Sequence, residues 1–467
     1  MTLLSVLPRR FRGALDGGVF ASAFASRVAG GAAWSLVGAV GLRGGQLLAM
    51  ILVARWLGRE GYGQFSMVQA TVGMAGALAG YGLGMTVTRA MACNRDHDRP
   101  RAGRIQALTS LTAWGMGGFF AVLLLLTAPW VAVHCLSAPE LTWALRLGAL
   151  TVFLSAVTGV QAGALAGLEA FKTTAGINVG CGLAMFPALL GGAHWGGLNG
   201  AIAGLVAVGV LNWGLNHWAV TYALARAGIV HDWRGCWGEW RLLWSFGVPA
   251  FLAGAMTAPV NWGACALLAQ LPGGYAELGV FNAVLRIKQT PEMLVGILAA
   301  PLLPVLSHCY AHGDRRRFTL LVLAGLALSM AVIVPPCLVQ MVWPSLSFLP
   351  YGDQFHGDPR LVRWLMAQGV LVSVLGMPLG WLTASTNRMW LGFFYNLAWG
   401  AAYLLLAYVL VRMFLGVGLA AANALAYLLT GVPFLAFLAW REWRAFHASR
   451  RAATGGIGGV SATGVTL

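Results

Sequence analysis

The sequence predicts an all-α integral membrane protein with about twelve transmembrane helices, arranged as two parallel six-helix repeats. Of its 467 residues, 59% are hydrophobic and only 9% are charged, and the mean hydropathy is +0.74. This is too little polar side-chain surface to cover a soluble globule of that length. The apolar residues fall into runs long enough to span a bilayer, and a glycine-rich turn between two such runs recurs halfway along the chain.

The recurring turn divides the chain into two halves. Residues 54–65 read A-R-W-L-G-R-E-G-Y-G-Q-F and residues 269–281 read A-Q-L-P-G-G-Y-A-E-L-G-V-F, so both contain a glycine-rich turn, a tyrosine and Gly-x-Phe. The final phenylalanines lie 216 positions apart (281 − 65), and Asn178 and Asn396 keep a similar offset of 218 (396 − 178). A repeat of six spans gives both halves the same orientation, related by an axis along the membrane normal.

A helix needs about 20 largely apolar residues to cross the hydrocarbon core of a bilayer. Twelve runs meet this condition, at approximately residues 32–57, 63–88, 105–133, 142–166, 171–193, 197–223, 243–270, 278–306, 318–342, 361–385, 389–413 and 417–440. With the N-terminus inside, 21 of the 30 basic residues fall at cytoplasmic ends, six fall outside and three lie within spans. Because basic loops are retained on the cytoplasmic side, both termini are predicted to be cytoplasmic.

These spans define the predicted segments of the chain. They are a cytoplasmic N-terminal segment (1–30), an N-lobe with spans one to six (31–224), a cytoplasmic interfacial linker helix (225–242), a C-lobe with spans seven to twelve (243–441) and a disordered cytoplasmic tail (442–467). The linker helix is predicted because Trp233, Trp237, Trp240 and Trp244 recur at the spacing of one helix face. Such a face is typical of the membrane interface, with docking of a partner protein as the alternative.

Several function classes are disfavoured by the residues. The net charge of +16 is explained by membrane orientation, so no nucleic-acid partner is predicted. The seven cysteines contain no C-x-x-C pair, and the cluster His308, Cys309, His312 and Asp314 lies in a basic loop, so no metal site is predicted. The chain has no Walker A loop, H-E-x-x-H motif or catalytic triad, so neither an enzyme nor a cofactor is predicted.

Charged residues within spans mark the candidate functional site, because each costs roughly 2.5–3.5 kcal/mol on insertion scales. Arg43 lies in span one, and Arg286, Lys288 and Glu292 lie in span eight. Arg43 and Arg286 have no acidic neighbour on their own helix and no charged counterpart in the other repeat. Together with Lys288 they predict a cationic cavity that suits an anionic ligand such as a diphosphate, which guanidinium groups bind in bidentate fashion.

The same residues have alternative interpretations. Glu292 lies four residues after Lys288, so the two side chains can pair, and Glu292 is also the candidate for ion coupling. Each arginine could instead contact carbonyls of a broken helix or extend to the membrane interface. Polar uncharged residues could line the cavity or join helices by hydrogen bonds. The candidates for the lining are Gln46, Asn178 and Asn396, followed by Asn212, Asn216, Asn261, Gln368 and Asn423.

The motifs of both halves resemble those of a known transporter family. The residues that carry the resemblance are A-R-x-L-G-x-x-G-Y-G-x-F at 54–65, G-L-G at 82–84 with T-R-A at 88–90, G-x-F-x-A-x-x-R at 279–286 and P-x-x-P-x-x-S at 301–307. They are similar to the polysaccharide transporter branch of the multidrug/oligosaccharidyl-lipid/polysaccharide exporter (MOP) superfamily over residues 31–440. The resemblance implies a MATE-like fold, in which two six-helix lobes form a V around a central cavity.

The resemblance also implies a function. Wzx-type relatives flip a polyprenyl-diphosphate-linked oligosaccharide across the bacterial inner membrane, for O-antigen, exopolysaccharide or capsule synthesis. Such a protein works among membrane lipids and beside a polysaccharide polymerase and glycosyltransferases. The alternatives are a cation-coupled multidrug-type antiporter that uses protons or sodium, a lipid II flippase, which usually has more spans, or a membrane scaffold for glycan synthesis.

Overall fold

The computed structural model describes residues 23–80, 82–95, 97–243, 256–299, 302–312, 314–385 and 389–455, and the regular elements in these ranges are helices. The first half contains α2 (Ala23–Gly80), α3 (Leu83–Asn94), α4 (Arg99–Trp130), α5 (Thr142–Gly167) and α6 (Phe171–Ala227). α4 continues into a π-helical turn, Val131–Cys135, which is followed by a 3-10 turn, Pro139–Leu141.

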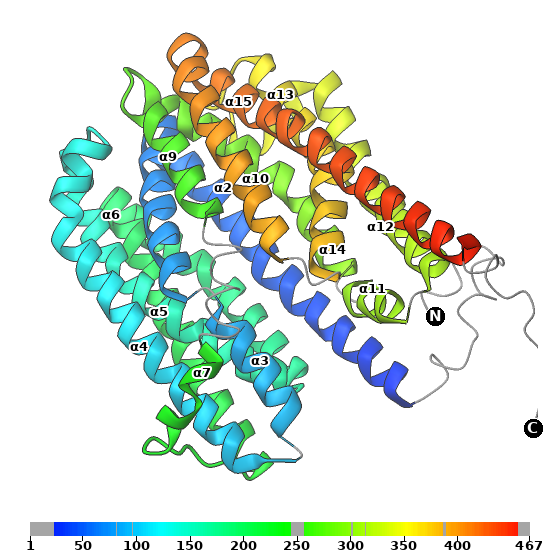
Figure 1. Cartoon of the computed structure of the whole chain (residues 1–467). Coiled ribbons are helices and arrows are strands. Elements are labelled where there is room, and N and C mark those ends of the chain that lie inside the picture. Colours follow the sequence, from blue (N-terminus) through cyan, green and yellow to red (C-terminus); the bar gives the residue numbers. More distant parts are fainter. Residues whose placement is uncertain are drawn as a thin grey trace, which may run out of the picture.

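The second half repeats this plan with more interruptions. Its helices are α7 (Trp240–Leu242), α9 (Thr257–Ala269), α10 (Gly274–Leu298), α11 (Leu302–Ala311), α12 (Arg315–Val342), α13 (Pro359–Leu371), α14 (Met377–Ser385) and α15 (Met389–Gly455). A π-helical turn, Val372–Gly376, joins α13 to α14, and 3-10 turns lie at Cys236–Glu239, Pro344–Ser347 and Leu349–Tyr351. Figure 1 shows the two groups of helices meeting at the top and diverging toward the bottom, which is the V expected for this fold.

The three longest helices are each broken near their middle. α2 has a non-helical residue at Gly58, with φ of 68°, which glycine adopts without steric cost. α6 is broken at Gly196 and Gly197, and α15 at Leu415. Each therefore supplies two membrane crossings, and in the described residues seven helices are long and apolar enough to span a membrane. With the three breaks counted, this arrangement is consistent with the predicted twelve spans.

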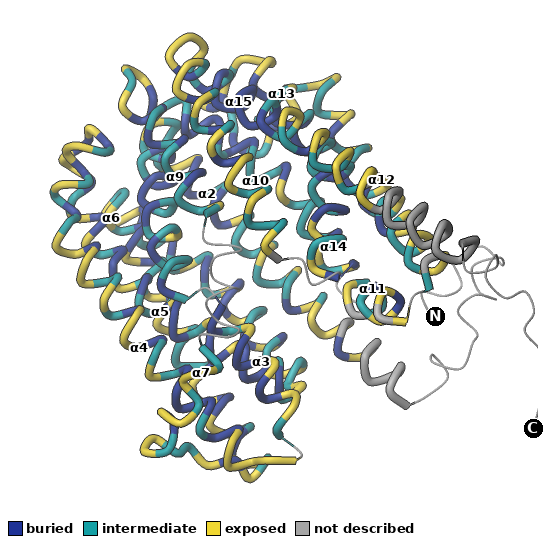
Figure 2. Tube along the Cα trace, viewed as in Figure 1, coloured by how far each residue is buried: buried dark blue, intermediate teal, exposed yellow. Residues whose placement is uncertain are grey.

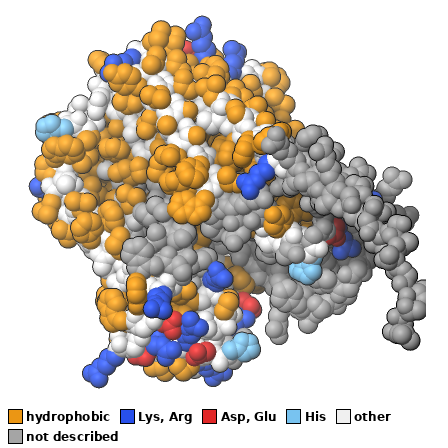
Figure 3. Space-filling view, viewed as in Figure 1, with side chains coloured by type: hydrophobic (Ala, Val, Ile, Leu, Met, Phe, Trp, Pro, Cys, Tyr) orange, Lys and Arg blue, Asp and Glu red, His pale blue; other side chains and the backbone are white. Residues whose placement is uncertain are grey.

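The surface of the helices matches a membrane environment. Large apolar side chains are exposed along the outer faces, including Leu126 at 72% and Leu405 at 71%. Figure 3 shows hydrophobic side chains over the upper part of the described surface, whereas charged side chains gather mainly at its lower end. The buried residues run along the faces where helices of one lobe pack together and where the lobes meet (Figure 2). The prediction of an all-α integral membrane protein is confirmed.

The two copies of the repeated turn pack against each other. A Cβ atom added to Gly63 of α2 would lie 1.8 Å from the carbonyl oxygen of Tyr275 in α10, and one added to Gly279 would lie 2.0 Å from the carbonyl oxygen of Arg59. Gly279 is 216 positions after Gly63, and Tyr275 is 216 positions after Arg59. Equivalent residues thus exchange equivalent contacts, as at the interface of a two-fold dimer. A pseudo-two-fold axis passes between the glycines.

Hydrogen bonds beside the glycines obey the same relation. Arg55 Nε donates to the carbonyl oxygen of Pro350 at 2.7 Å, and Gln270 Nε2 donates to that of Cys135 at 2.9 Å. Both partners shift by 215 positions between the two bonds (270 − 55 and 350 − 135). The side chain that ends the first span of each lobe therefore reaches across to a loop of the other lobe. We call the region of these bonds and of the Gly63 and Gly279 contacts the closed end.

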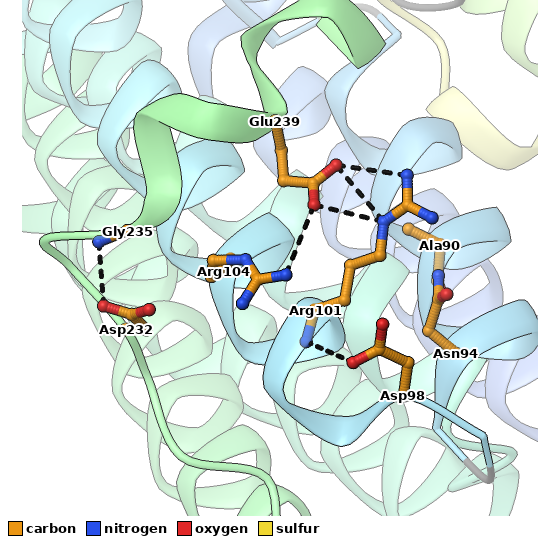
Figure 4. A network of polar contacts seen from close by, with 8 residues as sticks. All are labelled: Ala90, Asn94, Asp98, Arg101, Arg104, Asp232, Gly235 and Glu239. Carbon is orange, nitrogen blue, oxygen red and sulfur yellow. Dashed lines mark hydrogen bonds and ion pairs between the residues drawn. The ribbon is translucent and has the colours of Figure 1, made fainter.

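The linker between the lobes differs from the predicted helix. Within the described part of residues 225–242, the regular structure after α6 is the 3-10 turn Cys236–Glu239 and the single turn α7. Figure 4 shows the reason: Glu239 pairs with Arg101 at 3.1 Å and Arg104 at 3.6 Å, both on α4. These ion pairs and the burial of Cys236 hold the linker against the N-lobe. The linker therefore forms short turns here, where the spacing of the tryptophans predicted one longer helix.

The ends of the chain also differ from their predicted boundaries. α2 begins at Ala23, inside the predicted N-terminal segment 1–30, whereas residues 1–22 lie outside the described residues. α15 continues to Gly455, so the first part of the predicted disordered tail 442–467 is helical. Residues 456–467 lie outside the described residues, as does Trp244 of the predicted tryptophan stripe.

Candidate functional site

A cavity of about 670 Å³ lies between the first half of α2 and α10, and we call it the inter-lobe cavity. Its polar lining comes from Arg43 and Gln46 on α2 and from Arg286, Gln289, Thr290 and Glu292 on α10. Arg43 and Arg286 are 243 positions apart in the chain (286 − 43) and come from different lobes. The fold thus brings both arginines, Gln46 and Glu292 to one space.

Arg286 is held by side chains of the N-lobe. Its Nη2 donates to Gln69 Oε1 at 2.9 Å, and its guanidinium interacts electrostatically with the buried Tyr62. Arg286 also lines a second cavity, of about 700 Å³, whose other walls are α2, α5 and α6. A guanidinium fixed on one side by a neutral amide keeps its full charge and further N–H donors for a ligand.

Arg43 is exposed, and its Nη1 contacts Gln46 Oε1 at 3.4 Å, a long hydrogen bond. Among the described residues, neither Arg43 nor Arg286 has a carboxylate oxygen within 4.0 Å. No acidic side chain of the described residues therefore balances either charge by direct contact. Such a pair can bind an anion with two forked donors from opposite walls.

Lys288 lies away from this pair. It is only 3% exposed, contacts Gln368, and pairs with Glu292 at 3.2 Å. It lines a cavity of about 430 Å³ that lies mainly in the C-lobe and is closed on one side by Ala70, Gly73 and Met74 of α2; we call it the C-lobe pocket. Residues two positions apart on an α-helix point about 200° apart, so Arg286 and Lys288 face different spaces. Lys288 was predicted to line the same cavity as Arg286, and the structure places it in the neighbouring one.

Two predicted lining residues lie away from these cavities in the described part of the chain. The Nδ2 atom of Asn178 is 3.4 Å from the position of a Cβ added to Gly38, where α6 packs on α2. Asn396 is half-buried on α15 and interacts with other residues. In the part of the chain that the structure describes, neither lines the three cavities named above. Their cavity role remains a prediction, and the contact of Asn178 agrees with hydrogen bonding between helices.

Gln69 and Tyr62 were not singled out from the sequence, although a signal for Gln69 existed. Gln69 and Arg286 are 217 positions apart, almost the repeat offset. Because the axis at Gly63 and Gly279 places α2 against α10 at equivalent heights, a residue near position 70 must face one near 286. Tyr62 had no comparable signal, since its contacts with Tyr351 and Phe355 depend on the folded loops of the C-lobe.

Outside the spans, one titratable side chain on the linker is perturbed. Burial lowers the pKa of His231 below its usual value, and the nearby His217 lowers it further. His231 stacks on Trp233 with ring centroids 5.4 Å apart, and its Nδ1 has no hydrogen-bond partner among the described residues. This histidine is therefore held in its neutral form beside the N-lobe.

Comparisons with known proteins agree with this architecture. A family model described as "Polysaccharide biosynthesis protein" matches residues 28–309. The chain is 24% identical over 401 residues to the EPS I polysaccharide export inner membrane protein EpsE of Ralstonia nicotianae, covering 83% of this chain and 88% of the relative.

Solved structures show the fold. The inward-facing conformation of a multidrug resistance MATE family transporter of the MOP superfamily gives a TM-score of 0.72 at 15% identity, covering 87% of this chain and 98% of that one. The outward-facing conformation of such a transporter gives a TM-score of 0.61 at 16% identity, covering 88% and 95%. The predicted MATE-like fold is confirmed, and the predicted twelve spans are consistent with it.

Proposed function

Because this chain belongs to the polysaccharide biosynthesis protein family, we propose that it flips a polyprenyl-diphosphate-linked oligosaccharide across the inner membrane. Its relatives and its fold support a multi-pass transport protein of the inner membrane that acts in polysaccharide export. The proposal adds the substrate, which would serve O-antigen, exopolysaccharide or capsule synthesis. Both termini would lie in the cytoplasm, and a polymerase and glycosyltransferases would act on the same glycan.

One observation carries the proposal: Arg43 and Arg286, from different lobes, line one cavity and contact no carboxylate among the described residues. A diphosphate offers several anionic oxygens, which two guanidinium groups can hold in bidentate fashion. The inter-lobe cavity excludes part of the surrounding solvent, so these charge-assisted hydrogen bonds are stronger than in water. Since the two arginines are on different lobes, a bound diphosphate would join the lobes across the cavity.

The closed end supplies the second requirement of such a transporter. Opening the cavity on that side requires the lobes to separate at Gly63 and Gly279 and to break the bonds of Arg55 and Gln270. The predicted topology assigns this end to the periplasm. In this proposal the substrate enters from the cytoplasmic side and leaves when the closed end opens.

The cation-coupled antiporter is the weaker candidate. An ion-coupling carboxylate must be available to a proton or sodium ion from the cavity. Glu292 reaches the wall of the inter-lobe cavity, but its carboxylate already pairs with Lys288 at 3.2 Å. The site therefore contains its own cation, and a coupling role for Glu292 would require this ion pair to open.

Arginine substitutions test the proposed function. A charged hydrogen bond contributes about 1.5–3 kcal/mol, so Arg43→Ala and Arg286→Ala should each weaken binding of undecaprenyl diphosphate to the purified protein about tenfold or more. A lysine variant at either position keeps the positive charge but loses the bidentate geometry of the guanidinium, so it should bind the lipid with intermediate affinity. Glycan export in a host without its own flippase should fall in the same order, at equal amounts of membrane protein.

Arg360→Ala is the matched control, because Arg360 is exposed at the start of α13 and its side chain lines none of these cavities. It should bind and export as the wild type does. If Arg43→Ala and Arg286→Ala accumulate normally and still bind and export at wild-type levels, the diphosphate assignment is wrong.

A further inference from the structure

The C-lobe pocket has the lining of a site for a neutral polar molecule. Its volume of about 430 Å³ falls within the range of about 300–1,000 Å³ typical of small-molecule sites. Its aromatic rings and carboxamide side chains come from α9, α10, α13 and α15, and small or apolar residues of α2 complete the wall. Trp399 packs against Tyr403 and Tyr427 with ring centroids 5.6 and 5.5 Å apart.

Two buried polar atoms in the wall of this pocket have no hydrogen-bond partner among the described residues, although the Asn423 side chain also interacts with the hydroxyl of Tyr403. Asn423 is 8% exposed and its Oδ1 accepts no hydrogen bond, while Trp399 is 4% exposed and its Nε1 donates none. One group is an acceptor and the other a donor. A buried polar group left in this state is unfavourable, so native proteins pair it with protein, water or ligand. A hydroxyl both donates and accepts, and a molecule with several hydroxyls can satisfy both groups.

The charge of the pocket also selects against a phosphate. Its lining contains one cation and one anion, Lys288 and Glu292, and these neutralise each other at 3.2 Å. The inter-lobe cavity instead has two arginines. The two adjoining spaces therefore suit different parts of one ligand, an anionic part beside Arg286 and a neutral polyhydroxyl part beside Asn423.

The two spaces adjoin each other along α10. Gln289 and Glu292 line both the inter-lobe cavity and the C-lobe pocket. At a rise of about 1.5 Å per residue, Gln289 lies about 4.5 Å along the helix from Arg286. The sugar of a polyprenyl-diphosphate-linked glycan is bonded directly to the second phosphate, so it must lie within a few ångströms of the phosphate-binding group.

From this geometry we infer that the C-lobe pocket binds the sugar next to the diphosphate, an uncharged pyranose, with Asn423 and Trp399 hydrogen-bonded to its hydroxyls. The inference rests on the proposed function, because the diphosphate on Arg43 and Arg286 positions the sugar. It makes the C-lobe the part of the protein that distinguishes glycans. A site built to hydrogen-bond a hydroxyl discriminates strongly against a ligand that lacks it.

The test compares lipids with and without one sugar. Binding to the full-length protein in nanodiscs is measured for undecaprenyl diphosphate and for the same lipid carrying N-acetylglucosamine, glucose or galactose. The wild type should bind at least one sugar-bearing lipid about tenfold more tightly than the sugar-free lipid, as two added hydrogen bonds imply. Trp399→Phe keeps an aromatic ring without the N–H donor, and Asn423→Leu keeps a side chain of similar size without the acceptor, so both should bring this ratio toward one.

Controls separate the inference from the proposed function. Both variants should bind the sugar-free lipid within about twofold of the wild type, which also shows that they are folded. Trp390→Phe, on the same helix with the side chain 60% exposed, should keep the wild-type ratio. Arg286→Ala should weaken every lipid alike.

Three outcomes are decisive. If the wild type binds all lipids equally, or if Trp399→Phe and Asn423→Leu keep its ratio, the sugar site is wrong and the diphosphate assignment stands. If the wild type binds neither kind of lipid, the proposed function fails, and the sugar site with it. A wild-type preference that is lost in both variants supports the sugar site.

Discussion

Alanine at Gly63 or Gly279 should open the closed end. The added Cβ would lie 1.8 Å from the Tyr275 carbonyl oxygen at Gly63 and 2.0 Å from the Arg59 carbonyl oxygen at Gly279, where real contacts are almost never below 3.0 Å. The obstructing atoms are backbone atoms, so no rotamer change removes the clash. α2 and α10 must separate by about 1 Å or more at this point. This separation weakens the contact that joins the two lobes.

The size of the effect follows from the cost of overpacking. Inserting a methyl group into a tight contact costs about 1–3 kcal/mol, which corresponds to an approximately 5- to 150-fold shift between closed and open forms. Gly63 contacts α10 and Gly279 contacts α2. A movement that separates these two helices at one glycine therefore also relieves part of the clash at the other. The double variant should therefore cost less than the sum of the single variants.

The assay measures the distance between the lobes at this end. Spin labels are placed at Ser137 and Asp353 in a protein whose native cysteines are replaced; both positions are exposed and are 216 positions apart (353 − 137). Electron–electron resonance should show a longer-distance population in both alanine variants. Gly296→Ala is the control, because a Cβ at this α10 position meets nothing within 4 Å. Wild-type distances in both Gly63→Ala and Gly279→Ala would refute the closed end as the contact that keeps the lobes together.

Two further predictions concern buried and titrating groups. Lys288→Met should lower stability, by at most about 3–5 kcal/mol, because it leaves the carboxylate of Glu292, whose side chain is 18% exposed, without its cation. Adding Glu292→Gln should recover most of the loss, as measured by thermal unfolding in detergent, and equal stabilities of the single and double variants would contradict this. Because His231 has a lowered pKa, the unfolded chain binds its proton near pH 6.5 while the folded chain does not, so its contribution is present above about pH 6.5 and is lost as the pH falls below it. The unfolding midpoint should therefore fall more steeply between pH 7 and 5.5 in wild type than in His231→Gln, and parallel curves would count against the shift.

Much of the fold can be predicted from the sequence alone. The apolar runs set the helical spans because an unpaired backbone amide is too costly in a bilayer, and the repeat offset of 216 between Phe65 and Phe281 set the two lobes. The cost of charge in a span also identified Arg43 and Arg286. The separation of Lys288 from Arg286 could have been read from the sequence as well, since a step of two residues changes the helix face.

Other features were decided only by the tertiary structure. Glu239 pairs with Arg101, 138 positions earlier, and this contact holds the short helical turns at Cys236–Glu239 and Trp240–Leu242 against the N-lobe, where the tryptophan spacing predicted one longer helix. The partnership of Arg286 with Gln69 and the grouping of Trp399 and Asn423 in one pocket depend on how the helices of the two lobes pack. The spacing of apolar residues and the cost of placing a charge in the membrane are properties of a single helix, so both can be recognised in the sequence. Contacts between distant helices depend on which faces approach most closely, and here the glycines at 63 and 279 fix that approach by bringing two backbones together.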